Sequence, residues 1–440
     1  MAQKAIREYQ VKRLLQKNLE RCSKGEVSYQ GQAVLVTPEL GLEDLARDNP
    51  WLKGEKLAVK PDQLFGKRGK NNLLLVDAEF RPARAWIEER MGKEIVVHRE
   101  FDPDGNPLDA GIGGRLTHFI VEPMIPHKPQ EEHYLAFLGH RAGDYIYFST
   151  AGGVDIEENR DGLITIDVPA GTEIDGFDFE TPLAGQLRGE ELSLMTRFVR
   201  GCFVFYRDLH FSFLEFNPLV VAQGHVVPLD AKARLDDAAA FICSETWGDA
   251  SFPAPFGHSP APEEMYIEEL DRKSGSSMKL TILNPNGRVW TMVAGGGASV
   301  IYADQVVDLG FGPELANYGE YSGDPSAEET REYTRTILGL MTQQPAPGGK
   351  VFIIGGGIAN FTDVSKTFDG IIEALTEYAR NIKEQHIRIY VRRGGPNYVA
   401  GLARIREAAQ RLGLPMEVHG PEMHMTAIVK QALGTLSGGN

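Results

Sequence analysis

A basic turn follows an apolar run early in the chain, in the segment LAVKPDQLFGKRGKNNLLLV. Lys60 stands at the end of the first apolar run, and Lys67, Arg68, Gly69 and Lys70 form the turn. A triphosphate needs point cations and close approach of the backbone, which lysine, arginine and glycine supply. The segment is therefore a candidate phosphate-binding loop, and the alternative is a solvated basic turn between two strands.

The segment HFIVEPMIPHKPQEEHYL carries groups that suit a nucleoside. We expect its apolar run to be a strand ending in EPMIP, where backbone groups of Pro123 and Ile125 face an adenine edge. Glu132 follows and can accept hydrogen bonds from ribose hydroxyls. The alternative is an ordinary strand followed by a proline-containing loop.

Two oxygen donors, Asn217 and Asp230, lie in the segment FLEFNPLVVAQGHVVPLDAKA. The pattern predicts that they sit on two strands joined by a tight hairpin around Gly224. Facing oxygen ligands on neighbouring strands suit Mg²⁺ held against phosphates. An Asn-Pro turn and an aspartate at a strand end, without a metal, are the alternative.

An anion site is predicted in the second half of the chain. IGGGIANFTDVSKTF places glycines after an apolar run, and we expect Asn360, Phe361 and Thr362 at the start of a helix. A helix N-terminus attracts carboxylate or phosphate, although Asn360 and Thr362 could simply cap the helix. In YVRRGGPNY, Arg392 and Arg393 end the next strand, and two guanidiniums there would suit a polycarboxylate.

Apolar periodicity and prolines divide the chain into two domains. Residues 4–20 are predicted to form an amphipathic helix, and mixed helices and strands follow to about residue 245. Proline-rich SFPAPFGHSPAPEE marks a boundary. Beyond it, RVWTMVAGGG, KVFIIGGG and IRIYVRRGG each end in glycines, with a helix between the last two, which predicts a parallel sheet. We therefore expect domains at 1–245 and 266–440, with a linker at 246–265.

Composition excludes several classes of protein. The 440 residues carry a net charge of −15 without a long basic block, which argues against a nucleic-acid partner. No apolar stretch is long enough for a membrane span, and the charged N-terminus does not resemble a signal peptide. Three widely spaced cysteines predict neither a disulfide framework nor a zinc site, and indicate the cytoplasm.

The three segments of the first domain together resemble the ATP-grasp domain of the succinyl-CoA synthetase β subunit. The matching pieces are VKPDQL…KRGK, EPMIP and the NPL…LDAKA pair, although PDQLFG is less rich in glycine than the family's loop. The resemblance implies ATP contacts from Lys60, Arg68, Gly69, Pro123, Ile125 and Glu132, and a magnesium site at Asn217 and Asp230.

Longer strings identify the chain as a member of the ATP-citrate lyase family: LDRKSGSSMKL, RVWTMVAGGGASV, ELANYGEYSGDPS, GGGIANFTDV, VRRGGPNY and HMTAIV. The resemblance implies an ATP-grasp domain followed by a flavodoxin-like domain of the succinyl-CoA synthetase type. It also implies a citrate site made of Gly323, Asn360, Phe361, Thr362, Tyr378 and Arg393, in which Tyr378 arrives from a folded-back segment or a partner. Asp271, Ser274 and Ser276 are cation contacts by the same resemblance.

The resemblance further implies a reaction shared with another polypeptide. In this family ATP phosphorylates a histidine, the phosphoryl group passes to citrate, CoA gives citryl-CoA, and cleavage yields acetyl-CoA and oxaloacetate. None of the 11 histidines here lies in a Gly-His-Ala-Gly-like loop. We therefore expect the phosphohistidine, most of the CoA site and the cleavage domain on a partner subunit, in a cytoplasmic hetero-oligomer of the reductive citric acid cycle. The alternatives are the large subunit of citryl-CoA synthetase and a non-catalytic citrate or nucleotide sensor.

Overall fold

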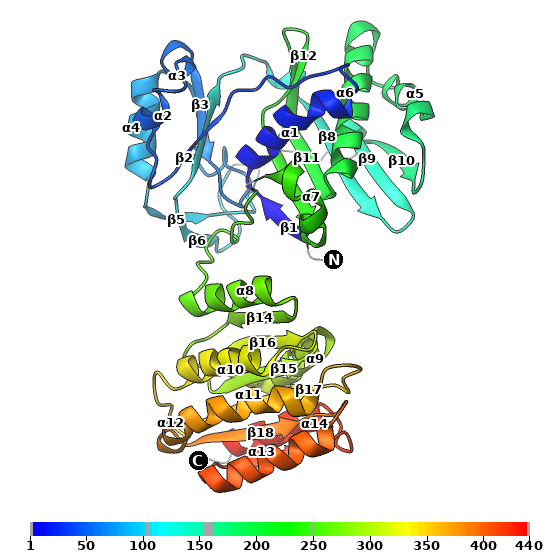
Figure 1. Cartoon of the computed structure of the whole chain (residues 1–440). Helices are drawn as coiled ribbons and strands as arrows, with labels where there is room; N and C mark the ends of the chain where they lie inside the picture. Colours follow the sequence, from blue (N-terminus) through cyan, green and yellow to red (C-terminus); the bar gives the residue numbers. More distant parts are fainter. Residues whose placement is uncertain (1–2, 103–104, 154–161, 249, 438–440) are drawn as a thin grey trace. The chain divides into compact units, whose positions relative to one another are not determined.

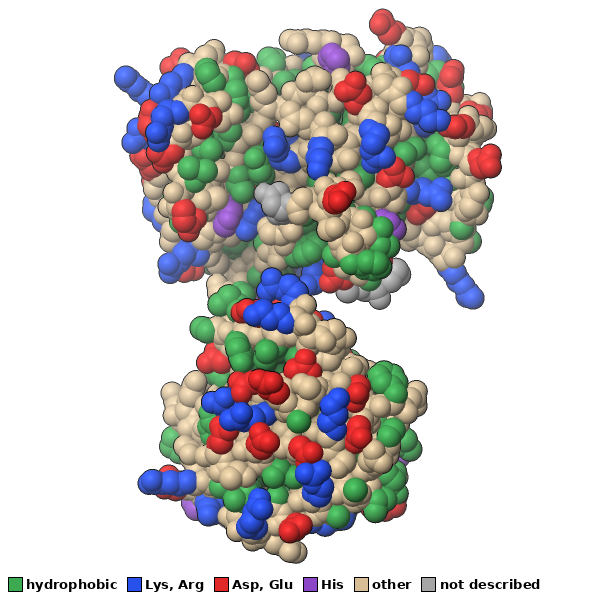
Figure 2. Space-filling model, viewed as in Figure 1, with side chains coloured by type: hydrophobic (Ala, Val, Ile, Leu, Met, Phe, Trp, Pro, Cys, Tyr) green, Lys and Arg blue, Asp and Glu red, His purple; other side chains and the backbone are tan. Residues whose placement is uncertain are grey.

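The structure is a computed structural model that describes residues 3–102, 105–153, 162–248 and 250–437 (Figure 1). It forms two compact units, Met1–His258 (unit 1) and Ser259–Asn440 (unit 2). The expected linker, residues 246–265, includes the end of helix α7 (Ala240–Trp247) and the start of α8 (Pro262–Ser274). Within the described ranges, no helix is long and apolar enough to cross a membrane. Acidic and basic side chains are interspersed over the face shown in Figure 2.

A large antiparallel sheet organises unit 1. Its strands run in the order β1-β13-β11-β8-β9-β10, and β12 pairs with β11. The bounds are β1 (Gln3–Ile6), β8 (His133–His140), β9 (Gly143–Ser149), β10 (Ile164–Pro169), β11 (Phe211–Ala222), β12 (His225–Pro228) and β13 (Ala231–Asp236). Helices α1 (Glu8–Cys22) and α6 (Gly189–Asp208) pack on this sheet, with the short α5 (Glu180–Leu183) beside α6.

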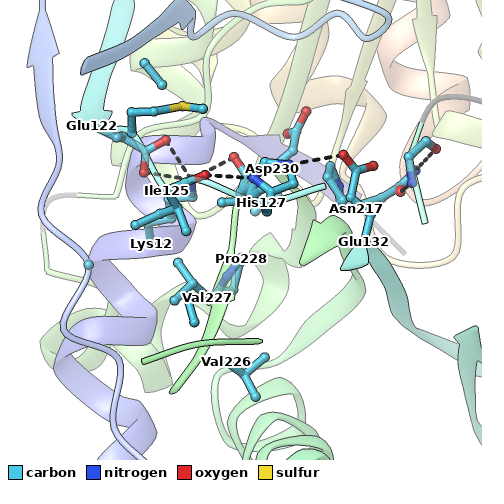
Figure 3. Close-up of a pocket in the computed structure, with 18 of the residues that line it drawn as sticks. Lys12, Glu122, Ile125, His127, Glu132, Asn217, Val226, Val227, Pro228 and Asp230 are labelled. Carbon is cyan, nitrogen blue, oxygen red and sulfur yellow. Dashed lines mark hydrogen bonds and ion pairs between the residues drawn. The ribbon is translucent and has the colours of Figure 1, made fainter. Parts of the chain in front are cut away.

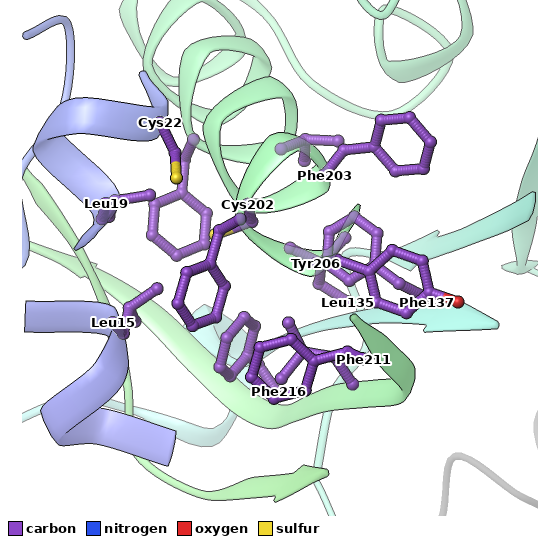
Figure 4. Packing of buried hydrophobic residues seen from close by; sticks show 14 of the residues in the cluster. Leu15, Leu19, Cys22, Leu135, Phe137, Cys202, Phe203, Tyr206, Phe211 and Phe216 are labelled. Atoms are coloured by element: carbon purple, nitrogen blue, oxygen red, sulfur yellow. The ribbon is translucent and has the colours of Figure 1, made fainter. Parts of the chain in front are cut away.

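The packing of α1 and α6 gives unit 1 its main core (Figure 4). Leu15, Leu19 and Cys22 of α1 lie against Cys202 and neighbouring aromatic residues of α6, above apolar side chains of β8 and β11. The apolar positions of α1 recur at steps of three and four, so one face of the helix is buried. This burial fixes the N-terminal helix against the large sheet.

The prediction of a helix over residues 4–20 was wrong at its start. Gln3–Ile6 form strand β1, which pairs antiparallel with β13, and the helix begins only at Glu8. Pairing with a strand more than 200 residues away overrides the local helical pattern, which is a weak preference. The mixed helices and strands expected to follow are present, for example where α6 ends at Asp208 and β11 begins at Phe211.

A smaller sheet forms the other half of unit 1. Its order is β2-β7-β3-β4, and a two-stranded ribbon, β5-β6, lies apart from it. The bounds are β2 (Val34–Val36), β3 (Leu57–Pro61), β4 (Leu75–Ala78), β5 (Glu94–Val97), β6 (Ile112–Arg115) and β7 (Phe119–Pro123), with helices α2 (Leu42–Leu45), α3 (Trp51–Gly54) and α4 (Phe80–Arg90). This half has its own apolar core.

Unit 2 is a six-stranded sheet in the order β14-β16-β15-β17-β18-β19. Every neighbouring pair is parallel except β14-β16, which confirms the predicted parallel sheet. The strands are β14 (Ser277–Ile282), β15 (Val289–Ala294), β16 (Asn317–Ser322), β17 (Lys350–Gly356), β18 (Ile387–Arg392) and β19 (Met416–His419). The helices that follow α8 are α9 (Gly296–Val306), α10 (Ala327–Met341), α11 (Val364–Glu377), α12 (Ala379–Glu384), α13 (Tyr398–Leu412) and α14 (Ala427–Ser437).

Helices cover both faces of this sheet. Along β15, Trp290 and Met292 belong to the core shared with α10, α11 and α13, whereas Val289 and Val293 belong to the core shared with α9 and α14. Successive side chains of a strand point to opposite faces, so a sheet buried on both sides reads as a continuous apolar run. The carboxyl ends of the parallel strands are left as the place for a ligand.

Close contact between α10 and α11 depends on Gly370. A Cβ atom at this position would lie 2.7 Å from the backbone nitrogen of Arg331 and would also meet the carbonyl of Ala327. We expect Gly370→Ala to lower the free energy of unfolding of unit 2 by about 1–3 kcal/mol, because the two helices must move apart. The change is measured by denaturant unfolding, with hydrogen exchange in peptides of unit 2 as the readout.

The matched control is Gly434→Ala in α14, where an added Cβ meets no atom within 4 Å. This substitution should raise stability by up to about 1 kcal/mol through helix propensity. Equal stability of Gly370→Ala and wild type would contradict the described packing of α10 on α11.

Candidate functional site

A cavity of about 1380 Å³ in unit 1 is lined by residues of both sheets (Figure 3). It brings together all eight residues that sequence patterns assigned to nucleotide and magnesium, which are Lys60, Arg68, Gly69, Pro123, Ile125, Glu132, Asn217 and Asp230. They come from β3, the turn after it, the end of β7, the start of β8, β11 and the connection after β12. The roles of these residues stay predictions, but their convergence on one cavity is observed.

The cations of the predicted phosphate loop are already engaged with the rest of unit 1. Lys60 Nζ donates to the carbonyl of Leu229 at 2.6 Å, and Arg68 donates to the carbonyl of Pro61 at 2.9 Å. Arg68 Nη2 also pairs with Asp230 Oδ1 at 2.5 Å. A predicted phosphate ligand and a predicted metal ligand thus neutralise each other within the cavity.

A buried glutamate of α1 connects these cations. The carboxylate of Glu8 lies 2.8 Å from Lys12 Nζ, 2.7 Å from Lys60 Nζ and 2.9 Å from Arg68 Nη2. Burial raises the pKa of Glu8, but the positive charges of Lys12, Lys60 and Arg68 outweigh burial and hold the pKa well below its usual value. Glu8 is therefore ionised at neutral pH.

One histidine contacts two of the residues predicted to bind the nucleoside. His127 Nδ1 lies 2.7 Å from the carbonyl oxygen of Ile125, and its Nε2 lies 3.2 Å from Glu132 Oε1. Both partners are hydrogen-bond acceptors, so they can also accept from an adenine amino group and a ribose hydroxyl. His127 was not singled out by the sequence patterns.

The two predicted metal ligands are neighbours, but Asp230 is not on a strand as predicted. It lies in the connection between β12 and β13, where the amides of Leu229 and Asp230 both donate to the carbonyl of Pro218 on β11 and the regular strand pairing is interrupted. Asn217 N donates to the carbonyl of Asp230 at 3.2 Å, and its side chain makes two hydrogen bonds with the backbone of Gly153. One carboxylate and one amide oxygen are a donor set that fits Mg²⁺.

A smaller pocket of about 250 Å³ lies at the carboxyl ends of the strands in unit 2. It brings together five of the six residues assigned to citrate by resemblance, namely Gly323, Asn360, Phe361, Thr362 and Arg393. Ala294, Gly295 and Ala298, around the start of α9, line the same pocket. Phe361 and Ile358 are exposed beside it, whereas Thr362 is buried.

The two arginines at the end of β18 have different surroundings. Arg392 donates to the carbonyls of Gly356, Met423 and Pro421, so its guanidinium serves the structure of the loops. Arg393 is 1% exposed and lines the pocket, and within the described part of the chain its Nε and Nη2 atoms have no hydrogen-bond partner.

An unpaired buried guanidinium is costly, which makes Arg393 the strongest structural indication of an anionic ligand. A Cβ on Gly356 would lie 2.5 Å from its Nη1 atom, so a larger residue there would displace the guanidinium. Tyr321 is likewise fully buried, and its ring lies 5.8 Å from the guanidinium carbon of Arg393. Sequence patterns had not identified Tyr321.

The prediction that Asn360 begins a helix was wrong, because α11 starts at Val364 and Asn360, Phe361 and Thr362 form the preceding loop. Asp363 caps the helix by accepting hydrogen bonds from the amides of Ser365 and Lys366. The capping alternative for Asn360 and Thr362 is thus also wrong, and their side chains remain near the pocket.

Tyr378 is not brought to this pocket within the chain. It follows the last residue of α11, where it packs on the core of unit 2, roughly 20 Å along the helix from the loop at Thr362. Its assignment to citrate stays a prediction that requires a partner.

Of the expected cation contacts, Asp271 and Ser274 lie in the last turn of α8, and Ser276 lies in the turn before β14. Asp271 Oδ1 accepts from the amide of Met278 at 2.6 Å, and the two serine hydroxyls lie 2.6 Å apart. These hydrogen bonds close the turn, and the backbone of Ser276 lies close to Gly323. A cation role for the three residues stays a prediction.

Comparisons with known families cover nearly the whole chain. A family model described as the ATP-citrate synthase ATP-grasp domain matches residues 2–247, and one described as ATP citrate lyase citrate-binding matches residues 258–435. The chain is 45% identical over 433 residues to ATP-citrate synthase alpha chain protein 2 of Arabidopsis thaliana, covering 98% of each chain. It is 44% identical over 434 residues to human ATP-citrate synthase, covering 99% of this chain and 38% of the human protein.

A solved structure shares the fold across both units. The ATP citrate lyase of Methanothrix soehngenii in complex with citrate and coenzyme A has a TM-score of 0.88 and 48% sequence identity, and the match covers 98% of this chain and 100% of that chain. A Methanosaeta concilii ATP citrate lyase with (3S)-citryl-CoA has a TM-score of 0.87 and 47% identity over a similar extent.

The carboxylate that supports the start of α1 gives unit 1 a measurable pH dependence. Asp62 is buried and accepts from the amides of Glu8 and Tyr9 at 2.9 and 3.1 Å. Burial, followed by the charge of Glu8, raises the pKa of Asp62 to about 6. The folded state therefore holds this proton more tightly than the unfolded state, where the pKa is about 4.

We expect the stability of the wild type relative to Asp62→Asn to be highest below about pH 4 and to fall as the pH rises towards about 6. Denaturant unfolding of both proteins across this range measures the difference. Asp77→Asn, at an exposed position in β4, is the control, and its dependence of stability on pH should match that of the wild type. If the stability of the wild type relative to Asp62→Asn instead rose with pH, the raised pKa of Asp62 would be contradicted.

Proposed function

The chain belongs to the ATP-citrate lyase family, and we propose that it is the subunit of this enzyme that binds Mg-ATP and citrate. The complete enzyme converts citrate, ATP and CoA into acetyl-CoA, oxaloacetate, ADP and phosphate. The observation that carries the proposal is the buried Arg393, whose guanidinium faces a pocket with two nitrogen atoms unpaired among the described residues. A polycarboxylate supplies the missing acceptors.

Mg-ATP is assigned to the cavity of unit 1. Lys60 and Arg68 neutralise the triphosphate. A Cβ added to Gly69 would meet no other atom within 4 Å, so the backbone at Gly69 faces open space and the phosphates can approach it closely. Backbone groups of Pro123 and Ile125 hold the adenine edge, while Glu132 accepts from the ribose. Catalysis in this cavity consists of positioning and charge stabilisation.

Magnesium is assigned to Asn217 and Asp230, whose oxygen atoms line the same cavity. When bound, Mg²⁺ neutralises phosphate oxygens and fixes their orientation. Asp230 must then give up its ion pair with Arg68, which frees the guanidinium for phosphate. Asp271, Ser274 and Ser276 are assigned to a second cation contact on the basis of the resemblance alone.

Citrate is assigned to the pocket of unit 2. Arg393 binds a carboxylate, and the loop of Asn360, Phe361 and Thr362 supplies backbone and side-chain donors, with Gly323 opposite. The start of α9 lies at the same pocket, and a helix N-terminus attracts carboxylates. Tyr378 joins the site only from another chain.

A partner subunit completes the enzyme in this proposal. It carries the phosphohistidine, most of the CoA site and the citrate-synthase-like cleavage domain, and its histidine moves between the two sites of this chain. An Arabidopsis thaliana relative matched over 98% of its length is named an alpha chain, whereas the match covers 38% of human ATP-citrate synthase, and this difference supports the proposal of a second polypeptide. We infer a cytoplasmic hetero-oligomer that acts in the reductive citric acid cycle.

The two alternative functions are not favoured. Relatives of comparable length are named ATP-citrate synthase alpha chains, and the two solved structures described above are ATP citrate lyases. A sensor that lacks catalysis has no use for cations and metal ligands gathered in one cavity.

Substitution of Arg393 tests the citrate site. Arg393→Gln should weaken citrate binding by about tenfold to a hundredfold, because charge-assisted hydrogen bonds to a carboxylate are lost. Titration calorimetry with citrate and, separately, with Mg-ATP measures the effect, and Mg-ATP affinity should not change.

Arg388→Gln provides the matched control, since Arg388 is an exposed arginine on the same strand. It should bind both ligands as the wild type does. Unchanged citrate affinity in Arg393→Gln would remove the central support for the proposed site.

A further inference from the structure

Glu8 stands behind the phosphate-binding side of the unit 1 cavity without forming part of its wall. Lys12, Lys60 and Arg68 line the cavity, whereas Glu8 does not and is 3% exposed. Its carboxylate nevertheless lies within 2.9 Å of a nitrogen atom of each of these cations. A ligand in the cavity would meet the cations and not the glutamate.

The position of Glu8 is fixed from several directions. Its backbone amide donates to Asp62 Oδ1 at 2.9 Å, which ties the start of α1 to the end of β3. Lys12, one turn further along α1, binds Glu122 of β7 at 2.7 Å and the carbonyl of Leu229 at 3.1 Å. The helix is packed on the large sheet, while Asp62 and Glu122 belong to the half of unit 1 built on the small sheet.

Lys60 depends on Glu8 more than the other cations do. Its nearest carboxylate is that of Glu8 at 2.7 Å, and the next, Glu122, lies 3.9 Å away. Glu122 is already held by Lys12, and Arg68 has Asp230 as a second partner. Without the charge of Glu8, the nearest carboxylate to Lys60 among the described residues would be Glu122, which is 3.9 Å away and shared with Lys12.

We propose that Glu8 is a positioning residue for nucleotide binding, which holds Lys60 and Arg68 at the orientation that receives the triphosphate. This inference rests on the proposed function of the cavity and adds a residue of the N-terminal helix to it. A group that orients ligand-binding side chains from behind acts through preorganisation, so its removal weakens binding although it touches no ligand.

A different role of Glu8 would change the affinity for Mg-ATP in the opposite direction. If Glu8 acted mainly as a negative charge that repels phosphate, its neutralisation would strengthen nucleotide binding. The geometry favours positioning, because three cations surround the carboxylate and separate it from the cavity.

The test is titration calorimetry of Mg-ATP and of citrate with the full chain carrying Glu8→Gln, which keeps the size of the side chain and removes its charge. We expect the dissociation constant for Mg-ATP to rise about tenfold, in the range found when orienting groups are removed. The dissociation constant for citrate, which reports on unit 2, should stay unchanged.

Glu20→Gln is the matched control, since Glu20 is an exposed glutamate of the same helix. It should bind both ligands normally. Unchanged or tighter Mg-ATP binding by Glu8→Gln would overturn the inference. Failure of the wild type to bind Mg-ATP would overturn the proposed function and the inference together, so the two kinds of failure are distinguishable.

A second measurement applies if Glu8→Gln does not fold. It is a crystal structure of the wild-type chain with Mg²⁺ and a non-hydrolysable ATP analogue. We expect Glu8 to remain within hydrogen-bonding distance of Lys60 and Arg68 while both contact phosphate oxygens. Separation of Glu8 from these cations in the complex would overturn the inference.

Discussion

Side chains that bind phosphate or carboxylate must hold positive charge in places that exclude much of the water, and a buried cation is stable only when acceptors or anions face it. The two units meet this constraint differently. In unit 1, carboxylates from α1, β7 and the turn after β12 neutralise the cations of the cavity. In unit 2, Arg393 faces its pocket with nitrogen atoms unpaired among the described residues. In the first site internal carboxylates compensate the cations, whereas the compensation of Arg393 in the second site depends on the ligand.

Strand ends and helix starts place both sites. In unit 2 the carboxyl ends of β15, β16, β17 and β18 surround the pocket, as expected for an open parallel sheet. In unit 1 the cavity is lined from two sheets, and α1 is fixed to both by apolar packing on one side and by ion pairs on the other. Under the proposed function, ATP and citrate bind to different units, so a mobile phosphoryl carrier is required.

Much of this arrangement could be predicted from local patterns. Glycines and polar residues after apolar runs pointed to Lys60 and Arg393, because strand ends are where backbone groups and short loops face a ligand. Long-range pairing could not be predicted, which is why strand β1 was mistaken for the start of a helix. Glu8 was also missed, although a Glu-Lys pair on the apolar face of a helix is a recognisable signal: Glu8 and Lys12 are one turn apart and both buried.

The central claim is that this chain is the nucleotide- and citrate-binding part of an enzyme completed by a second subunit. The most direct measurement is product analysis from citrate, ATP and CoA, with the chain alone and then with its co-purified partner. We predict no turnover by the chain alone, and acetyl-CoA with an equal amount of oxaloacetate when the partner is present. Full activity of the isolated chain, or citryl-CoA that accumulates without cleavage in the complex, would contradict the account.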